Sequence, residues 1–165
     1  MTKQELTIQS PEDISLQKYK SSLIASGGAM VLFAIWTVLR SVVQLDAILT
    51  SRADSAALMP MVSALISLSV IDLFLKIYVG MSARQEGLGR KKKRPYLTLG
   101  IIIAAVSVVS VLYMLFFEFP EAVRLYGLIV PIVTMAVEVT VLYASLDLVI
   151  SARKVRKLEK EMGRV

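Results

Sequence analysis

The stretch RKKKR at residues 90–94 lies between two long apolar stretches, the first ending near Met81 and the second beginning near Tyr96. A run of about twenty apolar residues is long enough to cross the hydrocarbon core of a bilayer as an α-helix. A short loop between two such spans stays on the cytoplasmic side when it carries many Lys and Arg residues. The stretch therefore predicts a cytoplasmic loop, and it orients the rest of the chain.

The composition is typical of a membrane protein. Hydrophobic residues make up 56% of the 165 residues and charged residues only 19%, and the mean hydropathy is +0.67. An ordinary soluble domain is less apolar and carries about 25% charged residues. Without the apolar stretches, too little sequence remains for a separate soluble domain. We therefore expect a single membrane domain.

The chain contains neither Cys nor His. This excludes thiol redox chemistry, disulfide bonds, thiolate or imidazole zinc sites, and catalytic pairs that use either residue. No recognisable nucleophile, metal-ligand set or cofactor motif takes their place. We expect a protein that is not an enzyme and that has no cofactor.

Apolar residues continue over four segments without the alternation that a half-buried β-strand would show. A transmembrane β-barrel would need more strands than this chain can supply. The predicted fold class is all-α, a polytopic integral membrane protein with four antiparallel transmembrane helices. The predicted spans are residues 21–45, 57–81, 96–117 and 123–150, within a transmembrane domain at 21–152.

Polar segments are expected at both ends of this domain, as a cytoplasmic lead at residues 1–20 and a basic cytoplasmic tail at residues 153–165. Within the lead, the sequence SPED at residues 10–13 is typical of a helix N-cap followed by Pro and by acids in the first turn. We therefore expect a short helix to start near Pro11. The pattern allows this helix either to run straight into the first span or to lie flat on the cytoplasmic surface.

Lys and Arg residues gather on one side of the four predicted spans, at both ends of the chain and in the middle loop. The opposite side carries few cations, and its second connection, residues 118–121, is short and acidic. We expect both termini to be cytoplasmic and the chain to lie in the cytoplasmic (inner) membrane or an equivalent membrane. Besides residues 90–94, the cations on this side are Lys3, Lys18, Lys20, Arg84, Arg153, Lys154, Arg156, Lys157, Lys160 and Arg164.

Two acidic residues lie deep inside predicted spans. At 1.5 Å per residue, Asp72 lies about 14 Å and Glu138 about 18 Å from the cytoplasmic end of its span. Lys76 follows Asp72 at i+4 and shares its helical face. Ionisable groups at such depths are costly and are functional candidates by default. We expect Asp72, Lys76 and Glu138 to form a buried cluster that binds an ion or a substrate. Its expected hydrogen-bonding neighbours are Ser69, Thr134 and Tyr143.

Two carboxylates and one ammonium leave an odd charge, so one acid of this cluster would take up a proton or a cation. We expect Pro131, seven residues before Glu138, to kink the helix near the cluster. The alternative is structural: Asp72 pairs with Lys76 alone, Glu138 is protonated, and the three residues only hold helices in register.

Other polar residues in the spans have simpler expected roles. Arg40 and Asp147 lie near span ends, where we expect them to anchor helices at the headgroups, a role also open to Lys76. Small residues at helical spacing, such as Ser22 and Ser26, are expected to let helices pack closely.

The basic loop is also a candidate for lipid binding, because each cation near the surface attracts anionic headgroups by about 1 kcal/mol. The alternative is that the loop only sets topology. Since the cations lie beside apolar spans rather than across a soluble face, we expect no nucleic-acid partner. The candidate contacts with anionic lipids are Arg90, Lys91, Lys92, Lys93 and Arg94.

Two classes of function remain open. The first is a cation- or proton-coupled small-solute permease or channel-like oligomer, since one bundle of four helices rarely encloses a pathway alone. The second is a non-catalytic accessory or interaction subunit of a larger membrane complex, or a membrane organiser that binds anionic lipids.

Overall fold

The computed structural model describes residues 10–50, 55–90, 95–118, 124 and 128–163. Nearly all of these are helical, and the all-α prediction is confirmed for them. α1, α2, α5 and the continuous unit of α3 and η1 are each long and apolar enough to cross a membrane. The elements are α1 (Pro11–Thr50), α2 (Ser55–Gly87), α3 (Pro95–Tyr113), the π-helix η1 (Met114–Glu118) and α5 (Ile129–Glu161).

α1 begins where its sequence provides a cap. The backbone N–H of Asp13 donates to Ser10 Oγ at 3.2 Å, and Pro11 occupies the first helical position, where no backbone donor is needed. The helix then continues without a break for 40 residues to Thr50. Of the two arrangements that the sequence left open, the structure has the helix that runs straight on.

The ends of two helices differ from the predicted spans. α2 continues past the apolar segment to Gly87, and α5 continues to Glu161. The added residues include Ala, Arg, Gln, Lys and Glu, which are good helix formers in a polar environment. Because α5 begins at Ile129, Pro131 lies in its first turn, where Pro is tolerated. The expected mid-helix kink at Pro131 is therefore wrong.

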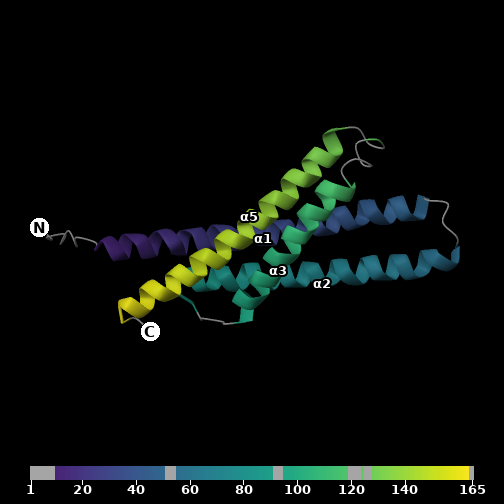
Figure 1. Ribbon diagram of the computed structural model, residues 1–165. Helices are drawn as coiled ribbons and strands as arrows, with labels where there is room; N and C mark the ends of the chain where they lie inside the picture. Colours follow the sequence, from purple (N-terminus) through teal and green to yellow (C-terminus); the bar gives the residue numbers. More distant parts are fainter. Residues whose placement is uncertain (1–9, 51–54, 91–94, 119–123, 125–127, 164–165) are drawn as a thin grey trace, which may run out of the picture.

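α1 and α2 lie side by side along most of their length, and α3 and α5 cross this pair obliquely (Figure 1). The backbones of α1 and α2 come closest at Gly27 and Gly80. A Cβ on Gly80 would lie 2.5 Å from the Gly27 carbonyl oxygen, and a Cβ on Gly27 would lie 2.7 Å from that of Gly80. Close approach of this kind requires residues without side chains, so these two glycines set the spacing of the pair.

The buried core lies where all four helices meet. It is formed by residues from the first half of α1, the second half of α2, the start of α3 and the second half of α5, and Tyr96 is its largest fully buried side chain. Large apolar side chains elsewhere on the helices face outward, which is typical of helices surrounded by lipid. The core residues are Leu23, Met30, Val79, Ala83, Tyr96, Ile103, Ala144, Leu148, Val149 and Ala152.

Candidate functional site

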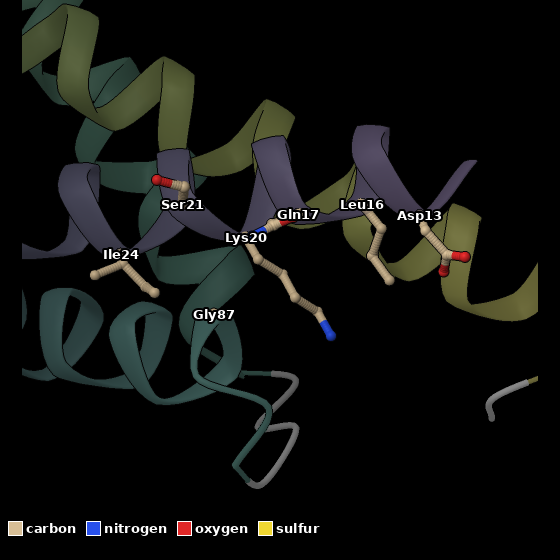
Figure 2. Close-up of a pocket in the computed structure, with 7 residues that line it drawn as sticks. All are labelled: Asp13, Leu16, Gln17, Lys20, Ser21, Ile24 and Gly87. Carbon is tan, nitrogen blue, oxygen red and sulfur yellow. The ribbon is translucent and has the colours of Figure 1, made fainter. Parts of the chain in front are cut away.

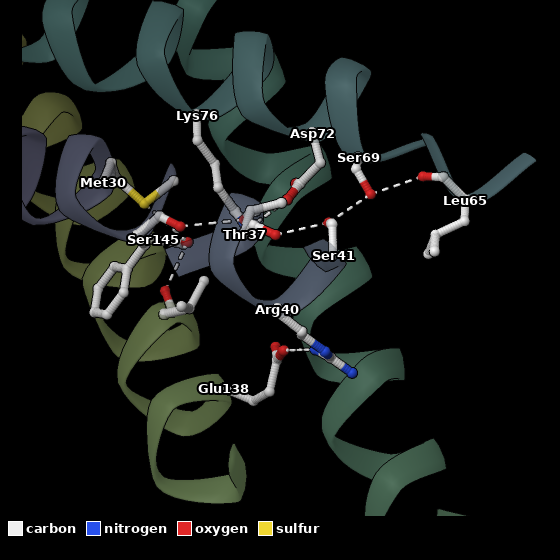
Figure 3. Close-up of polar contacts among 12 residues, drawn as sticks. Met30, Thr37, Arg40, Ser41, Leu65, Ser69, Asp72, Lys76, Glu138 and Ser145 are labelled. Carbon is white, nitrogen blue, oxygen red and sulfur yellow. Dashed lines mark hydrogen bonds and ion pairs between the residues drawn. The ribbon is translucent and has the colours of Figure 1, made fainter. Parts of the chain in front are cut away.

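One turn of α1 carries three polar side chains within an otherwise apolar helix, and each contacts a polar side chain of another helix (Figure 3). Thr37 and Ser41 contact α2, whereas Arg40 contacts α5. Since residues three and four apart share a helical face, α1 gathers polar groups from both neighbours at one level. We call the charged groups at this level and their threonine the polar centre: Thr37, Arg40, Asp72, Lys76 and Glu138.

The α2 side of the polar centre is an ion pair. Lys76 Nζ lies 2.6 Å from Asp72 Oδ2 and donates to Thr37 Oγ1 at 2.9 Å. The Thr37 hydroxyl donates to Asp72 Oδ2, also at 2.9 Å. The side chain of Lys76 is 13% exposed and that of Asp72 is 38% exposed. The structure thus brings these two predicted site residues together, and Thr37 ties them to α1.

The α5 side is a second ion pair, between Glu138 and Arg40. The Glu138 side chain is 14% exposed and that of Arg40 is 28% exposed, so both charges are largely removed from the surface. Arg40 lies one turn along α1 from Thr37, and this places Glu138 beside the Asp72–Lys76 pair through α1. Arg40 supplies a second cation, so the charges of the polar centre balance and the expected odd charge is not found there.

The expected hydrogen-bonding neighbours lie in different surroundings. The Ser41 hydroxyl donates to Ser69 Oγ at 2.7 Å, which adds a contact between α1 and α2 one turn beyond Thr37. Thr134 is half-buried, one turn before Glu138 on α5. Tyr143 is 72% exposed, so it faces outward from the bundle.

A second polar group lies between α1 and α5, nearer the chain ends. Asp147 Oδ2 accepts hydrogen bonds from Ser22 Oγ at 2.7 Å and from Ser26 Oγ. Ser151 Oγ donates to Ser22 Oγ at 3.0 Å. Across the described ranges, no Lys or Arg forms an ion pair with Asp147. We call Ser22, Ser26, Asp147 and Ser151 the serine–aspartate cluster.

The polar ends of the helices are held by further ion pairs. Arg156 binds Glu86 with two parallel hydrogen bonds, both 2.8 Å long, and its guanidinium lies 5.6 Å from the centre of the Tyr96 ring. The Glu86 side chain is only 1% exposed. Lys20 Nζ lies 2.9 Å from Glu159 Oε1. These contacts join α1, α2, α3 and α5 at one end of the bundle.

A hollow of about 560 Å³ opens at the same end, between the start of α1 and the end of α2 (Figure 2). Gly87 forms part of its wall because α2 packs tightly there: a Cβ on Gly87 would lie 2.7 Å from Ile24 Cγ1. Arg90 follows closely in sequence and is exposed. The other candidate lipid contacts, Lys91, Lys92, Lys93 and Arg94, lie outside the described residues.

Two of the residues at these sites, Arg40 and Asp147, were missed as site residues because the sequence reading treats charges near span ends as headgroup anchors. The available signal was spacing: Ser22 and Ser26, like Asp147 and Ser151, are i,i+4 pairs of polar residues in apolar segments. Among the described residues, no group of three or more acidic side chains is placed to hold a metal ion.

The chain matches no known protein family, no characterised protein and no solved structure. The polar centre and the serine–aspartate cluster are therefore the features that bear on its function.

Proposed function

We propose that the chain is an integral membrane protein with four antiparallel spans and with both termini on the cytoplasmic side. Four apolar helices with outward-facing Leu, Ile, Val and Phe side chains support the membrane location. The concentration of Lys and Arg in the lead, the middle loop and the tail supports the orientation. In this arrangement the serine–aspartate cluster lies nearer the cytoplasm and the polar centre lies deeper.

Within that membrane protein, we propose a cation- or proton-coupled permease for small solutes. The observation that carries this proposal is the convergence of two ion pairs, one involving α2 and one involving α5, on a single turn of α1 inside apolar spans. Replacing a buried ion pair by well-packed apolar residues is often neutral or stabilising. Two pairs kept at one level therefore favour a functional role over a purely structural one.

In the proposed mechanism, Asp72 and Glu138 bind the transported cation or proton. Each acid is already held by a cation of the same chain, so an incoming cation or proton would displace Lys76 or Arg40 from its carboxylate. Lys76 would tune the affinity of Asp72, because losing the nearby positive charge makes the carboxylate a better base. The positions of the helices that these pairs hold would then change when a cation or proton binds.

The permease is proposed to work as an oligomer. The most apolar window of α2 has none of its residues buried within the single chain. An unpaired face of this kind leaves α2 available to pack against other copies, which together would line a pathway.

Flux measurements test the proposal. Proteoliposomes containing a pH-sensitive dye would be challenged with sodium and proton gradients and with a panel of amino acids, amines and sugars. We expect gradient-driven flux in the natural protein and its loss in Asp72→Asn and Glu138→Gln. Glu161→Gln, a change to an acid whose side chain is 54% exposed, is the matched control. Flux that survives in the double variant of Asp72 and Glu138 contradicts the carboxylate mechanism.

A second candidate function, a non-catalytic subunit or organiser at an anionic lipid surface, is favoured by the cytoplasmic end of α5. Arg153, Lys154, Lys157 and Lys160 are all exposed there, and each would add about 1 kcal/mol of attraction near an anionic surface. Co-flotation with liposomes that contain phosphatidylserine tests it. Binding that disappears when these four cations and residues 90–94 are neutralised, together with no flux for any solute, would support this second function over the permease.

A further inference from the structure

The serine–aspartate cluster differs from the other acidic sites in its balance of charge. In the polar centre, Asp72 is paired with Lys76 and Glu138 with Arg40. Among the described residues, the hydrogen-bond partners of the Asp147 side chain are the hydroxyl groups of Ser22 and Ser26. An ionised Asp147 would therefore have hydroxyl donors but no Lys or Arg partner within the described ranges.

Asp147 itself is half-buried. Within its cluster, Ser26 is 6% exposed and Ser151 is 1% exposed. A charge among such groups is stabilised by a counter-ion held in place by nearby polar atoms.

The cluster also supplies the oxygen atoms that such a counter-ion requires. The four side chains carry one carboxylate and three hydroxyl groups, and carboxylate and hydroxyl oxygens are ligands for hard cations. A hydroxyl has two lone pairs besides its hydrogen. The Ser22 and Ser26 oxygens would bind a cation if their hydrogens were donated elsewhere.

The same protein shows where those hydrogens would go. Several of its helical serines donate to the backbone carbonyl four residues earlier, an arrangement that any helical serine can adopt. Ser69 donates to Leu65 O at 2.7 Å, and Ser145 on α5 donates to Val141 O at 2.8 Å. At Ser22 and Ser26, a rotation of the hydroxyl about its Cβ–Oγ bond would turn the hydrogen away from Asp147 and leave the oxygen lone pairs facing the carboxylate.

We propose that Ser22, Ser26, Asp147 and Ser151 form a binding site for a small monovalent cation, Na⁺, at the contact between α1 and α5. The single negative charge of the cluster matches a single positive charge. A divalent ion would leave an excess positive charge, because Asp147 is the single acid of the cluster. The assignment of Na⁺ as the coupling ion rests on the proposed permease function, in which the polar centre would then bind the proton, whereas Na⁺ binding itself does not.

Sodium binding can be measured without transport. The full-length protein in lipid nanodiscs would be titrated with NaCl, with choline chloride keeping the ionic strength constant, and both bound ²²Na⁺ and the unfolding temperature would be recorded. We expect saturable binding with a matching rise in unfolding temperature, and a weaker response to K⁺. Asp147→Asn should abolish both signals.

A double variant, Ser22→Ala with Ser26→Ala, keeps the acid and removes two oxygen ligands. It therefore tests Na⁺ binding at the cluster even if Asp147→Asn fails to fold. We expect its Na⁺ affinity to fall by at least about tenfold, as is common when groups that support a metal site are removed. Ser41→Ala with Ser69→Ala is the matched control, because it removes two hydroxyls from the contact between α1 and α2. Its Na⁺ affinity should be unchanged.

Saturable Na⁺ binding that persists in both cluster variants, or a response to pH with none to Na⁺, overturns the site. Na⁺ binding without any flux overturns the permease and leaves the site standing. Flux that continues when Na⁺ binding has been abolished overturns Na⁺ as the coupling ion and leaves the permease standing.

Discussion

Arg40 of α1 and Glu138 of α5 form an ion pair although they are 98 residues apart in sequence. Both residues lie within helices apolar enough to cross a membrane, and neither side chain is more than 28% exposed. The pair balances the charge of Glu138 and connects α5 to α1.

Replacing one residue of this pair should lower the free energy of unfolding more than replacing both residues. We expect Arg40→Gln to lower the free energy of unfolding by about 3 kcal/mol, because it leaves a buried carboxylate without a counter-ion. The double variant of Arg40→Gln with Glu138→Gln should recover much of this loss. Unfolding in detergent micelles measures all members of the cycle. Single-variant costs that simply add in the double variant would show that the two side chains do not interact.

The contact between α1 and α2 should tolerate no side chain at Gly80. A Cβ there would lie 2.5 Å from the carbonyl oxygen of Gly27, so Gly80→Ala must push the two backbones apart. We expect a loss of about 1–3 kcal/mol, as for other overpacked sites. Gly28→Ala is the matched control, since nothing lies within 4 Å of a Cβ at that position. Equal unfolding temperatures for the two variants would contradict the close packing.

At the end of the bundle that holds Glu86 and Tyr96, geometry rather than charge should determine the contribution of Arg156 to stability. Arg156→Lys keeps the charge but loses the two parallel hydrogen bonds to Glu86, and we expect a cost of about 1.5 kcal/mol. Lys157→Arg is the control, because its ion pair with Glu161 is 3.7 Å long and exposed. It should change the free energy of unfolding by less than about 0.5 kcal/mol. If Arg156→Lys left the free energy of unfolding unchanged, the two parallel hydrogen bonds to Glu86 would not stabilise the helix contacts.

The proposed orientation can be read directly, because the chain has no native Cys and every introduced thiol is therefore the only one. Arg90→Cys and Lys160→Cys should react with a membrane-impermeant maleimide only in inside-out vesicles. Arg124→Cys should react only in right-side-out vesicles. Labelling of all three from the same side would rule out the proposed topology.

The sequence predicted the helices well because their signal is continuous: four apolar runs of sufficient length cannot satisfy their backbone groups in lipid in any other compact way. The start of α1 was also visible, since Ser10 and Pro11 act through local capping. The proximity of Asp72 and Lys76 followed from i,i+4 spacing within one helix.

The contacts between helices could not be predicted in the same way. Whether Glu138 meets Lys76 or Arg40 depends on how α5 is rotated against α1, and rotation is set by packing across the whole contact. Asp147 was assigned to the headgroup region because depth along its own helix was the only available measure. Its partners come from α1, which is more than a hundred residues earlier in the sequence.

The single turn of α1 that holds both ion pairs has a mechanical consequence. Thr37 is bound from α2 and Arg40 from α5, and the two side chains point in directions fixed by the same short length of backbone. A turn of α1 about its axis would move both side chains together. A rearrangement of α1 at either contact is therefore felt at the other.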